Sequence, residues 1–279
     1  MKYNTDGQRL WTRQFGSVRA DNVWAVTTDP AGSVYVAGRR RLADNSWDIF
    51  VTKLSSGGSE IWTWVSGIAG SDYGFDVSVD AMGSVFVGGA GYPAPGYSDI
   101  YVTKLDSSGN AEWTKVFDVR EEDRANDVEV DGLGNVYVSG YTHNQAQGFL
   151  WKMDGQGNRL WMNAATPGGW GLYGDADGVA RLAATGSPGS KMYVYITQTD
   201  ALGNSVWDKA ELSGFMRLFP RALAYDDEYG FAAAGYAEDF SGVGGYNIFV
   251  ERYELVPEPA VLGVLVLGGM ALLRRRRNV

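Results

Sequence analysis

Three aspartates recur at one position of the sequence and offer carboxylates for ligand binding. Asp21, Asp72 and Asp123 stand 51 residues apart, and each lies eight residues before another aspartate. If the fold gathers them into an acidic ring, their oxygens could bind Ca²⁺ or a basic partner. The alternative interpretation is that each carboxylate caps its own loop by accepting backbone hydrogen bonds, as loop aspartates usually do.

Aromatic residues form the second set with binding chemistry. They lie in irregular segments between predicted strands, and the candidates for ligand contact are Trp47, Tyr97, Tyr141, Trp170 and Tyr173. Flat rings beside Asp and Asn side chains suit sugars, because a pyranose presents apolar C–H faces rimmed by hydroxyl groups. The alternative is that half of these rings only hold the loops against the strands.

The residues needed for catalysis are scarce. The absence of cysteine excludes disulfides, thiolate zinc sites and cysteine nucleophiles, and the single histidine, His143, excludes a histidine-rich metal site. The segment DADG at 175–178 fails as a calcium loop, because its glycine is fourth rather than sixth and the twelfth residue is Gly186. Nothing in the spacing selects a catalytic carboxylate pair. We therefore predict that the protein is not an enzyme and that it has no cofactor.

The elements that position these residues form a repeat with a period near 50. Tryptophan follows a glycine by four residues in five segments, GQRLW, GSEIW, GNAEW, GNRLW and GNSVW, with tryptophans at positions 11, 62, 113, 161 and 207. Segments such as VYVAG (34–38) and FVTKL (50–54) recur in the same order, and the fourth copy is degenerate. Each unit therefore predicts four short strands rich in β-branched and aromatic residues.

Two kinds of connection join the predicted strands. Asp-x-x-Gly segments, as at 29–32, 106–109 and 131–134, predict tight hairpin turns in which glycine takes a positive φ. The other connections are long and differ in every copy. Antiparallel order places all tight turns on one face and all long loops on the other, and variation confined to one face usually marks the working surface of a repeat protein.

These motifs resemble the SBBP-type propeller repeat, with its D-x-x-G-N-x-Y-V-x-G and F-V-x-K-L-D-x-x-G-N segments, across nearly all of residues 1–254. The resemblance implies an all-β fold, a β-propeller with about five four-stranded blades. It says little about the ligand. Either the first tryptophan strand completes the last blade and closes a ring, or the sequence lacks upstream blades and a signal peptide, which the absence of an apolar segment after Met1 favours.

Residues 255–279 form a second unit with different composition. The protein has 24 basic and 33 acidic residues, a net charge of −9, which argues against nucleic acid as a partner. The tail runs against this balance: fourteen apolar residues, 260–273, precede Arg274, Arg275, Arg276 and Arg277. We predict a short transmembrane helix, about 21 Å long at ~1.5 Å per residue, whose arginines stay in the cytoplasm.

The stiff segment Val256, Pro257, Glu258 and Pro259 precedes this apolar run. The order VPEP, apolar run and arginine cluster resembles the PEP-CTERM sorting signal of Gram-negative bacteria. The resemblance implies export, anchoring in the inner membrane with the body periplasmic, and processing near VPEP by an exosortase-type transpeptidase. The mature protein would then lie at the surface or outside the cell, where proteins of this class usually accompany exopolysaccharide production.

We therefore expect an exported, non-catalytic β-propeller that acts as a binding or matrix scaffold, with a polysaccharide or an envelope protein as its partner. Two alternatives remain open. A glycan-active hydrolase or lyase would need a tight carboxylate cluster on the long-loop face. A purely structural spacer would bind neither kind of partner.

Overall fold

The computed structural model describes residues 1–253 apart from 69, 93–95, 119–121, 143–146, 164–168, 175–179, 187–192, 213–216, 227–229 and 239–245. All regular structure in the described residues is β-strand. Among those residues there is no helix with the length and apolar character that a membrane crossing requires. The predicted transmembrane helix, the VPEP segment and the arginine cluster lie outside the described residues.

The strands from β3 to β21 form five consecutive antiparallel sheets, each built in chain order, and β1 and β2 form a separate two-stranded sheet. Blade 1 contains β3 (Asp21–Thr28), β4 (Val34–Arg41), β5 (Trp47–Leu54) and β6 (Glu60–Val65), and blade 2 contains β7 (Ser71–Val79), β8 (Val85–Tyr92), β9 (Asp99–Leu105) and β10 (Ala111–Phe117). Blade 3 contains β11 (Arg124–Val130), β12 (Val136–Thr142), β13 (Gln147–Met153) and β14 (Arg159–Asn163). Blade 4 contains β15 (Gly169–Gly174), β16 (Ala180–Gly186), β17 (Tyr193–Thr199) and β18 (Ser205–Leu212). Blade 5 has the three strands β19 (Arg217–Asp226), β20 (Gly230–Glu238) and β21 (Tyr246–Tyr253).

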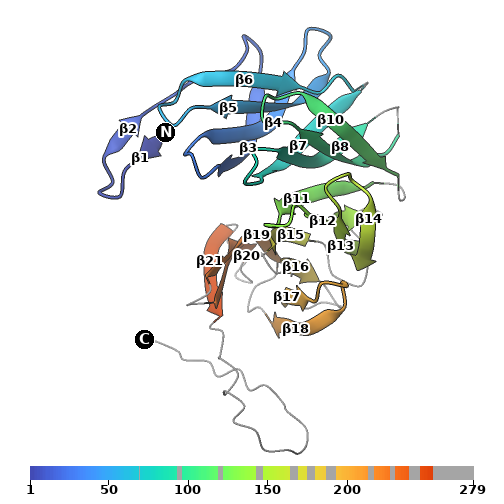
Figure 1. Ribbon diagram of the computed structural model, residues 1–279. Helices are drawn as coiled ribbons and strands as arrows, with labels where there is room; N and C mark the ends of the chain where they lie inside the picture. The colour runs from blue at the N-terminus through green and yellow to red at the C-terminus, as the bar shows by residue number, and fades with distance from the viewer. Residues whose placement is uncertain are drawn as a thin grey trace, which may run out of the picture.

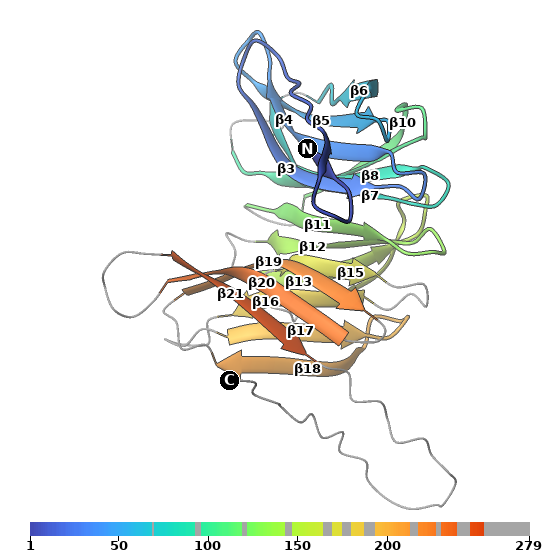
Figure 2. The ribbon, with the colours of Figure 1, turned by 90° about the vertical axis from the view of Figure 1, so that its left-hand side faces the viewer.

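The five sheets are the blades of a β-propeller, which confirms the predicted fold class. The first strand of each blade lies toward the middle of the molecule, while β6, β14 and β18 lie at the outside (Figure 1). Each blade packs on the next through that inner strand, β7 against blade 1, β11 against blade 2, β15 against blade 3 and β19 against blade 4. Figure 2 shows the sheets following one another from β3 to β18.

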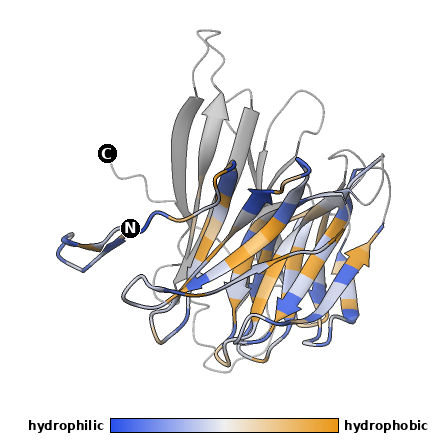
Figure 3. Ribbon diagram, turned by 90° about the horizontal axis from the view of Figure 1, so that it is seen from above, coloured by the Kyte–Doolittle hydropathy of each residue, from blue (hydrophilic) through white to orange (hydrophobic). Residues whose placement is uncertain are grey.

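The core lies between the faces of neighbouring blades. Between blades 1 and 2, Ile49 and Val51 meet Val77 and Val87, all of which are buried. Between blades 2 and 3, Trp151 stacks on Phe149 with 4.3 Å between ring centroids. Successive side chains of a strand point to opposite faces of the blade, and both faces are packed: Tyr35, Val36 and Ala37 of β4 are all buried. Figure 3 shows the apolar segments of these strands in orange.

The tight turns have the predicted geometry. In the turn after β9, the Asp106 carboxylate accepts hydrogen bonds from the backbone N–H groups of Ser108 and Asn110, and Gly109 has φ +86°. The same pattern recurs at the aspartates 80, 131, 154 and 200. Each carboxylate accepts hydrogen bonds from backbone N–H groups that the hairpin turn would otherwise leave unpaired. These aspartates therefore stabilise the turns and do not face a ligand site.

The recurring tryptophan joins each of blades 1 to 3 to the following blade. Its indole Nε1 donates to a backbone carbonyl in the last tight turn of the following blade, from Trp62 to Ser107 at 3.1 Å and from Trp161 to Ala201 at 3.0 Å. The turn glycine lies under the indole, so that a Cβ on Gly109 would lie 2.7 Å from the ring of Trp62. The turn glycine is therefore required both for its positive φ and for the close approach of the indole.

The first hairpin makes the same tryptophan-to-turn contact, but it does not close the circle of blades. β2 (Arg9–Trp11) pairs with β1 (Lys2–Tyr3), and Trp11 Nε1 donates to Ser56 O at 2.9 Å. Of the two alternatives for this tryptophan strand, completion of the last blade is not observed, since β21 pairs only with β20 among the described strands. In the described residues no comparable seam joins blade 5 to blade 1. Val26 of blade 1 is accordingly 66% exposed, whereas its counterpart Val77 is 3% exposed beneath blade 1.

Candidate functional site

A bulge redirects one side chain in each inner strand. The pairing register shifts between Val23 and Ala25 in β3, and between Gly74 and Asp76 in β7. The extra residues at these shifts are Trp24 and Phe75. Because a bulge turns its extra residue out of the regular pleat, the two rings leave the seams between blades and meet each other at 5.3 Å.

Around these two rings lies a group of aromatic and arginine side chains at the long-loop end of blades 1 to 3. We call it the arginine–aromatic cluster, and it consists of Trp24, Arg39, Trp47, Tyr73, Phe75, Tyr92, Arg124 and Tyr141.

Arg39 is the centre of the first half of the cluster. Its guanidinium carbon lies 4.0 Å from the ring centroid of Trp47, 4.5 Å from that of Tyr73 and 5.2 Å from that of Trp24. Its Nε donates to Asn22 Oδ1 at 3.2 Å. Three strands of two blades, β3, β4 and β7, together with the start of β5, therefore converge on one cation. Such cation–π contacts orient the rings as well as stabilising them.

Arg124 continues the cluster into blade 3. It lies 4.2 Å from the ring centroid of Phe75 and 5.0 Å from that of Tyr141, and its Nε donates to Asn126 Oδ1. Tyr73 links the two halves, because it stacks on Phe75 at 5.9 Å and meets Tyr92 edge-on at 5.8 Å. The cluster is thus continuous across three blades.

The cluster is open on its outer side. Trp24 is 43% exposed, and Arg39, Trp47, Tyr73 and Phe75 are half-buried. The aromatic rings are fixed by their contacts with the arginines and remain partly exposed to solvent. They form a preorganised binding surface, since no side chain has to be ordered when a ligand binds.

The five predicted aromatic residues fall in three places. Trp47 and Tyr141 belong to the cluster. Tyr97 is exposed and lies outside it. Trp170 and Tyr173 lie on β15, Trp170 at that strand's register shift, and their side chains are outside the described residues. Ligand binding by any of these residues stays a prediction.

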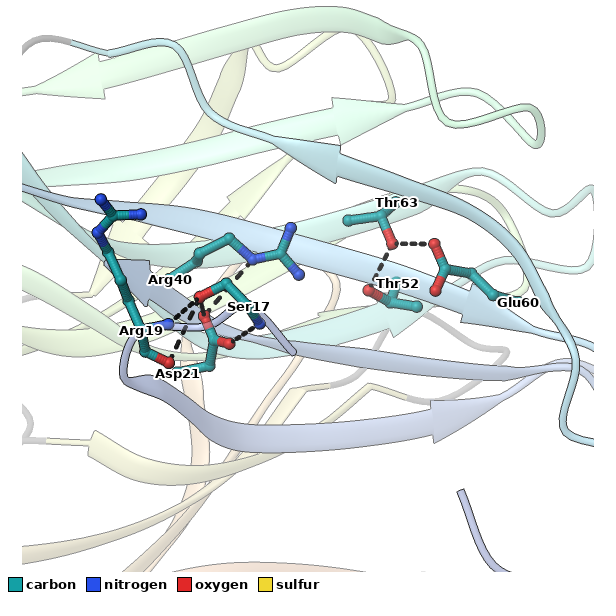
Figure 4. A network of polar contacts seen from close by, with 7 residues as sticks. All are labelled: Ser17, Arg19, Asp21, Arg40, Thr52, Glu60 and Thr63. Carbon is teal, nitrogen blue, oxygen red and sulfur yellow. Dashed lines mark hydrogen bonds and ion pairs between the residues drawn. The ribbon is translucent and has the colours of Figure 1, made fainter. Parts of the chain in front are cut away.

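The three predicted aspartates do not form a surface ring. Asp72 and Asp123 are fully buried, whereas Asp21 accepts a hydrogen bond from the backbone N–H of Ser17 and pairs with Arg40 Nε at 3.5 Å (Figure 4). The same figure shows a second, separate polar chain, in which Thr63 donates to Glu60 and contacts Thr52. Asp21 therefore caps its loop, as the alternative interpretation predicted.

Asp72 is instead half of a buried acidic pair at the seam of blades 1 and 2. Burial and the nearby Asp48 carboxylate raise the pKa of Asp72 to about 7, and burial with the Asp44 carboxylate raises the pKa of Asp48 to about 6. Ser66 Oγ donates to Asp72 Oδ2 at 3.4 Å, while the other carboxylate oxygen has no hydrogen-bond partner. Loss of hydration without a cation disfavours the charged form of both groups.

A second acidic group lies along the inner strands of blades 2 and 3. Burial raises the pKa of Asp76, Asp127 and Glu129, the last to about 7, and a hydrogen bond joins the carboxyl groups of Asp76 and Asp127. Asp76 also accepts from the backbone N–H of Val128 at 3.0 Å, and Asp127 from that of Leu172 at 2.9 Å. Each carboxylate thus satisfies an amide at the open edge of the next inner strand.

Among the described residues no group of three or more His, Cys, Asp or Glu side chains is arranged to hold a metal ion. The arginine–aromatic cluster offers ring surfaces and cationic donors.

Sequence reasoning missed Trp24, Arg39, Phe75 and Arg124. Two signals were available: Arg39 directly follows the recurring VYVAG segment, and Trp24 and Phe75 occupy the same position of successive repeats. Neither signal identifies a bulge, which depends on pairing with the neighbouring strand.

No family model matches the chain, and no curated protein matches it. Among solved structures, it is similar to a protein of unknown function from Dyadobacter fermentans, with 12% identity and a TM-score of 0.58 over 86% of this chain and 77% of that chain. It also matches the β-propeller domain of the Trilobed protease from Pyrococcus furiosus, with 10% identity and a TM-score of 0.48 over 83% of this chain and 68% of that one. For puromycin hydrolase the identity is 12% and the TM-score 0.49, over 83% of this chain and 36% of that one. At these identities the likeness concerns the fold alone.

Proposed function

We propose that the protein is an exported, non-catalytic β-propeller that binds polysaccharide through the arginine–aromatic cluster. The observation that carries this proposal is the convergence of Trp24, Trp47 and Tyr73 on Arg39 at the long-loop end. Contacts that recur from blade to blade serve the architecture, whereas this group has no second copy among the residues that the structure describes. A sugar ring placed on the exposed part of Trp24 would bury its apolar C–H face, and its hydroxyl groups would remain at the polar rim.

The tail supports export as the second part of the proposal. In this proposal VPEP at 256–259 and the arginines at 274–277 act as a PEP-CTERM sorting signal, read by an exosortase-type transpeptidase in the inner membrane. The test is the intact mass and both termini of the protein from its native cells, with soluble and membrane fractions kept separate. A mature form without residues 260–279 supports processing. A form that keeps Val279 and occurs only in membranes contradicts it.

The rival function, a glycan-active hydrolase or lyase, would use the acidic residues of the inner strands. Asp76 and Asp127 have the raised pKa that a general acid needs. However, one carboxylate oxygen of each residue accepts a hydrogen bond from a backbone N–H group of the next blade. The two carboxyl groups are also hydrogen-bonded to each other, whereas a glycosidase needs them on either side of the bound sugar. We therefore assign these carboxyl groups to the seams between blades.

Binding is tested with the full chain, held in detergent micelles, against a panel of neutral and acidic polysaccharides in affinity electrophoresis. We expect at least one polysaccharide to retard the protein. Trp24→Ala or Trp47→Ala should lower the affinity about five- to thirtyfold, since one aromatic contact contributes roughly 1–2 kcal/mol. The matched control is Leu133→Ala, which removes an exposed apolar side chain from the tight-turn end. Release of reducing ends would favour the hydrolase, and retardation by none of the polysaccharides would favour the spacer.

A further inference from the structure

The first 47 residues carry a net charge opposite in sign to that of the whole protein. Residues 1–47 contain seven lysines and arginines and four aspartates, a local charge of +3 in a chain of −9. Three of these cations are consecutive in β4, at positions 39, 40 and 41. At physiological ionic strength charges act over about 8 Å, so a ligand at this position responds to the local arginines and to the acidic residues beside them. Of these acidic residues, Asp21 already pairs with Arg40, and burial raises the pKa of Asp48 and Asp72.

The three consecutive arginines have different partners. Arg40 pairs with Asp21 at 3.5 Å. Arg39 and Arg41 lie on the other side of the strand, and their guanidinium carbons are 4.0 Å and 5.9 Å from the ring centroid of Trp47. In the part of the chain that the structure describes, no carboxylate pairs with either of them. The guanidinium groups of Arg39 and Arg41 therefore both contact the indole of Trp47, and neither forms an ion pair with a described carboxylate.

The geometry of Arg39 leaves its terminal nitrogens for a ligand. The plane of its guanidinium is engaged by aromatic rings, and its Nε is used by Asn22. The terminal nitrogens have no acceptor among the described residues, and they are not sealed from solvent. Paired N–H groups at the edge of a guanidinium match the two oxygens of a carboxylate.

We infer that the ligand of the cluster is an anionic polysaccharide whose sugar rings carry carboxylates, as uronate polymers do. The carboxylate takes the donors of Arg39 and Arg41, while the apolar face of the same or the next sugar lies on Trp24. This inference rests on the proposed function and adds the ligand class. The arginines make the cluster selective for negatively charged ligands, and the aromatic rings restrict these ligands to flat, partly apolar sugar units.

The test compares polygalacturonate with its fully methyl-esterified form, which keeps the backbone and removes the charge. We expect the full chain to bind polygalacturonate at least about tenfold more tightly, because a charge-assisted contact contributes roughly 1.5–3 kcal/mol. Affinity should fall as salt is raised. Arg39→Gln and Arg41→Gln should remove the preference, and Arg39→Lys should restore only part of it because lysine lacks the paired donors.

The matched control is Arg159→Gln, since Arg159 also lies over a tryptophan, 5.3 Å from the ring centroid of Trp151, but in blade 3 and outside the cluster. An equal loss in this variant, or equal binding of polyglutamate, would overturn the inference in favour of unspecific charge attraction. Equal binding of polygalacturonate and its ester would overturn the inference and leave polysaccharide binding intact. Binding of no polysaccharide would overturn the proposed function as well.

Discussion

At the tight-turn end of the blades the same contacts recur from one blade to the next, whereas at the long-loop end of blades 1 to 3 the described contacts differ from blade to blade. Trp62 and Trp161 each donate to a turn of the following blade, over a glycine with positive φ. The contacts of Arg39 with Trp47 and Tyr73 have no copy in blade 2, because Ala90 occupies the position of Arg39 there. Because the repeated contacts at the tight-turn end join the blades, the side chains at the long-loop end can differ between blades and serve binding.

The carboxyl groups of the protein differ in a related way. Hydrogen bonds from Asn110 hold the pKa of Asp106 below its usual value, and backbone and side-chain donors do the same at Asp154. Toward the inner strands and the long loops, burial raises the pKa of Asp48, Asp72 and Glu129. The turns thus favour charged carboxylates, and the seams disfavour them.

The largest expected difference between the tight-turn end and the long-loop end is in the stability of two tryptophan variants. Trp62→Ala should lower the free energy of unfolding by about 3 kcal/mol, because it removes a packed indole and its bond to Ser107. Trp47→Ala should cost clearly less stability while it weakens polysaccharide binding. Chemical denaturation of both variants measures the difference. Equal losses of stability would mean that the long-loop end is as structural as the tight-turn end.

The turn glycines separate backbone strain from the indole contact. Gly109→Ala should destabilise the protein by roughly 1–3 kcal/mol, since alanine is strained at φ +86° and its Cβ would lie 2.7 Å from the Trp62 ring. Gly134→Ala is the matched control, because Gly134 has φ +80° with nothing within 4 Å of a Cβ. The difference between their denaturation midpoints measures the indole contact, and identical midpoints would contradict that contact.

The buried carboxyl groups predict that stability rises as the pH is lowered from 8 to 6. Asp72 and Glu129, with a pKa of about 7, take up protons in the folded protein while the unfolded chain remains ionised. The folded state then binds more protons, so acidification favours it. Asp72→Asn should flatten the rise, as followed by thermal unfolding at fixed ionic strength. A melting temperature that falls between pH 8 and pH 6 would count against buried carboxyl groups.

The turn aspartates predict the smallest effect and the opposite sign. Asp106→Asn should destabilise the protein slightly at pH 7, because it removes the charge that accepts from Ser108 and Asn110. Since the folded pKa of Asp106 is lowered, this stabilisation is present above about pH 4 and is lost as the pH falls further. The difference from the wild type should therefore shrink at pH 3. A difference that stays constant would assign the effect to side-chain shape.

The repeat, the tight turns and the number of blades were predictable from the order of residues. Asp-x-x-Gly segments and alternating strands act through contacts within a few residues, so their outcome depends little on the rest of the chain. The recurring tryptophan was recognisable for the same reason, although its hydrogen bond to the next blade was not.

The tertiary structure alone decided which single-copy residues meet. Asp72 and Asp123 look like surface ligands in the repeat, yet both are buried, because the preceding blade covers the start of each of these inner strands. Trp24 and Arg39 are unremarkable by position, and they meet Trp47 and Tyr73 only because bulges and the packing of two blades bring β3, β4, β5 and β7 to one point. Local rules decide hairpins, whereas contacts between blades depend on side chains about 50 residues apart in the sequence, whose proximity no local pattern records.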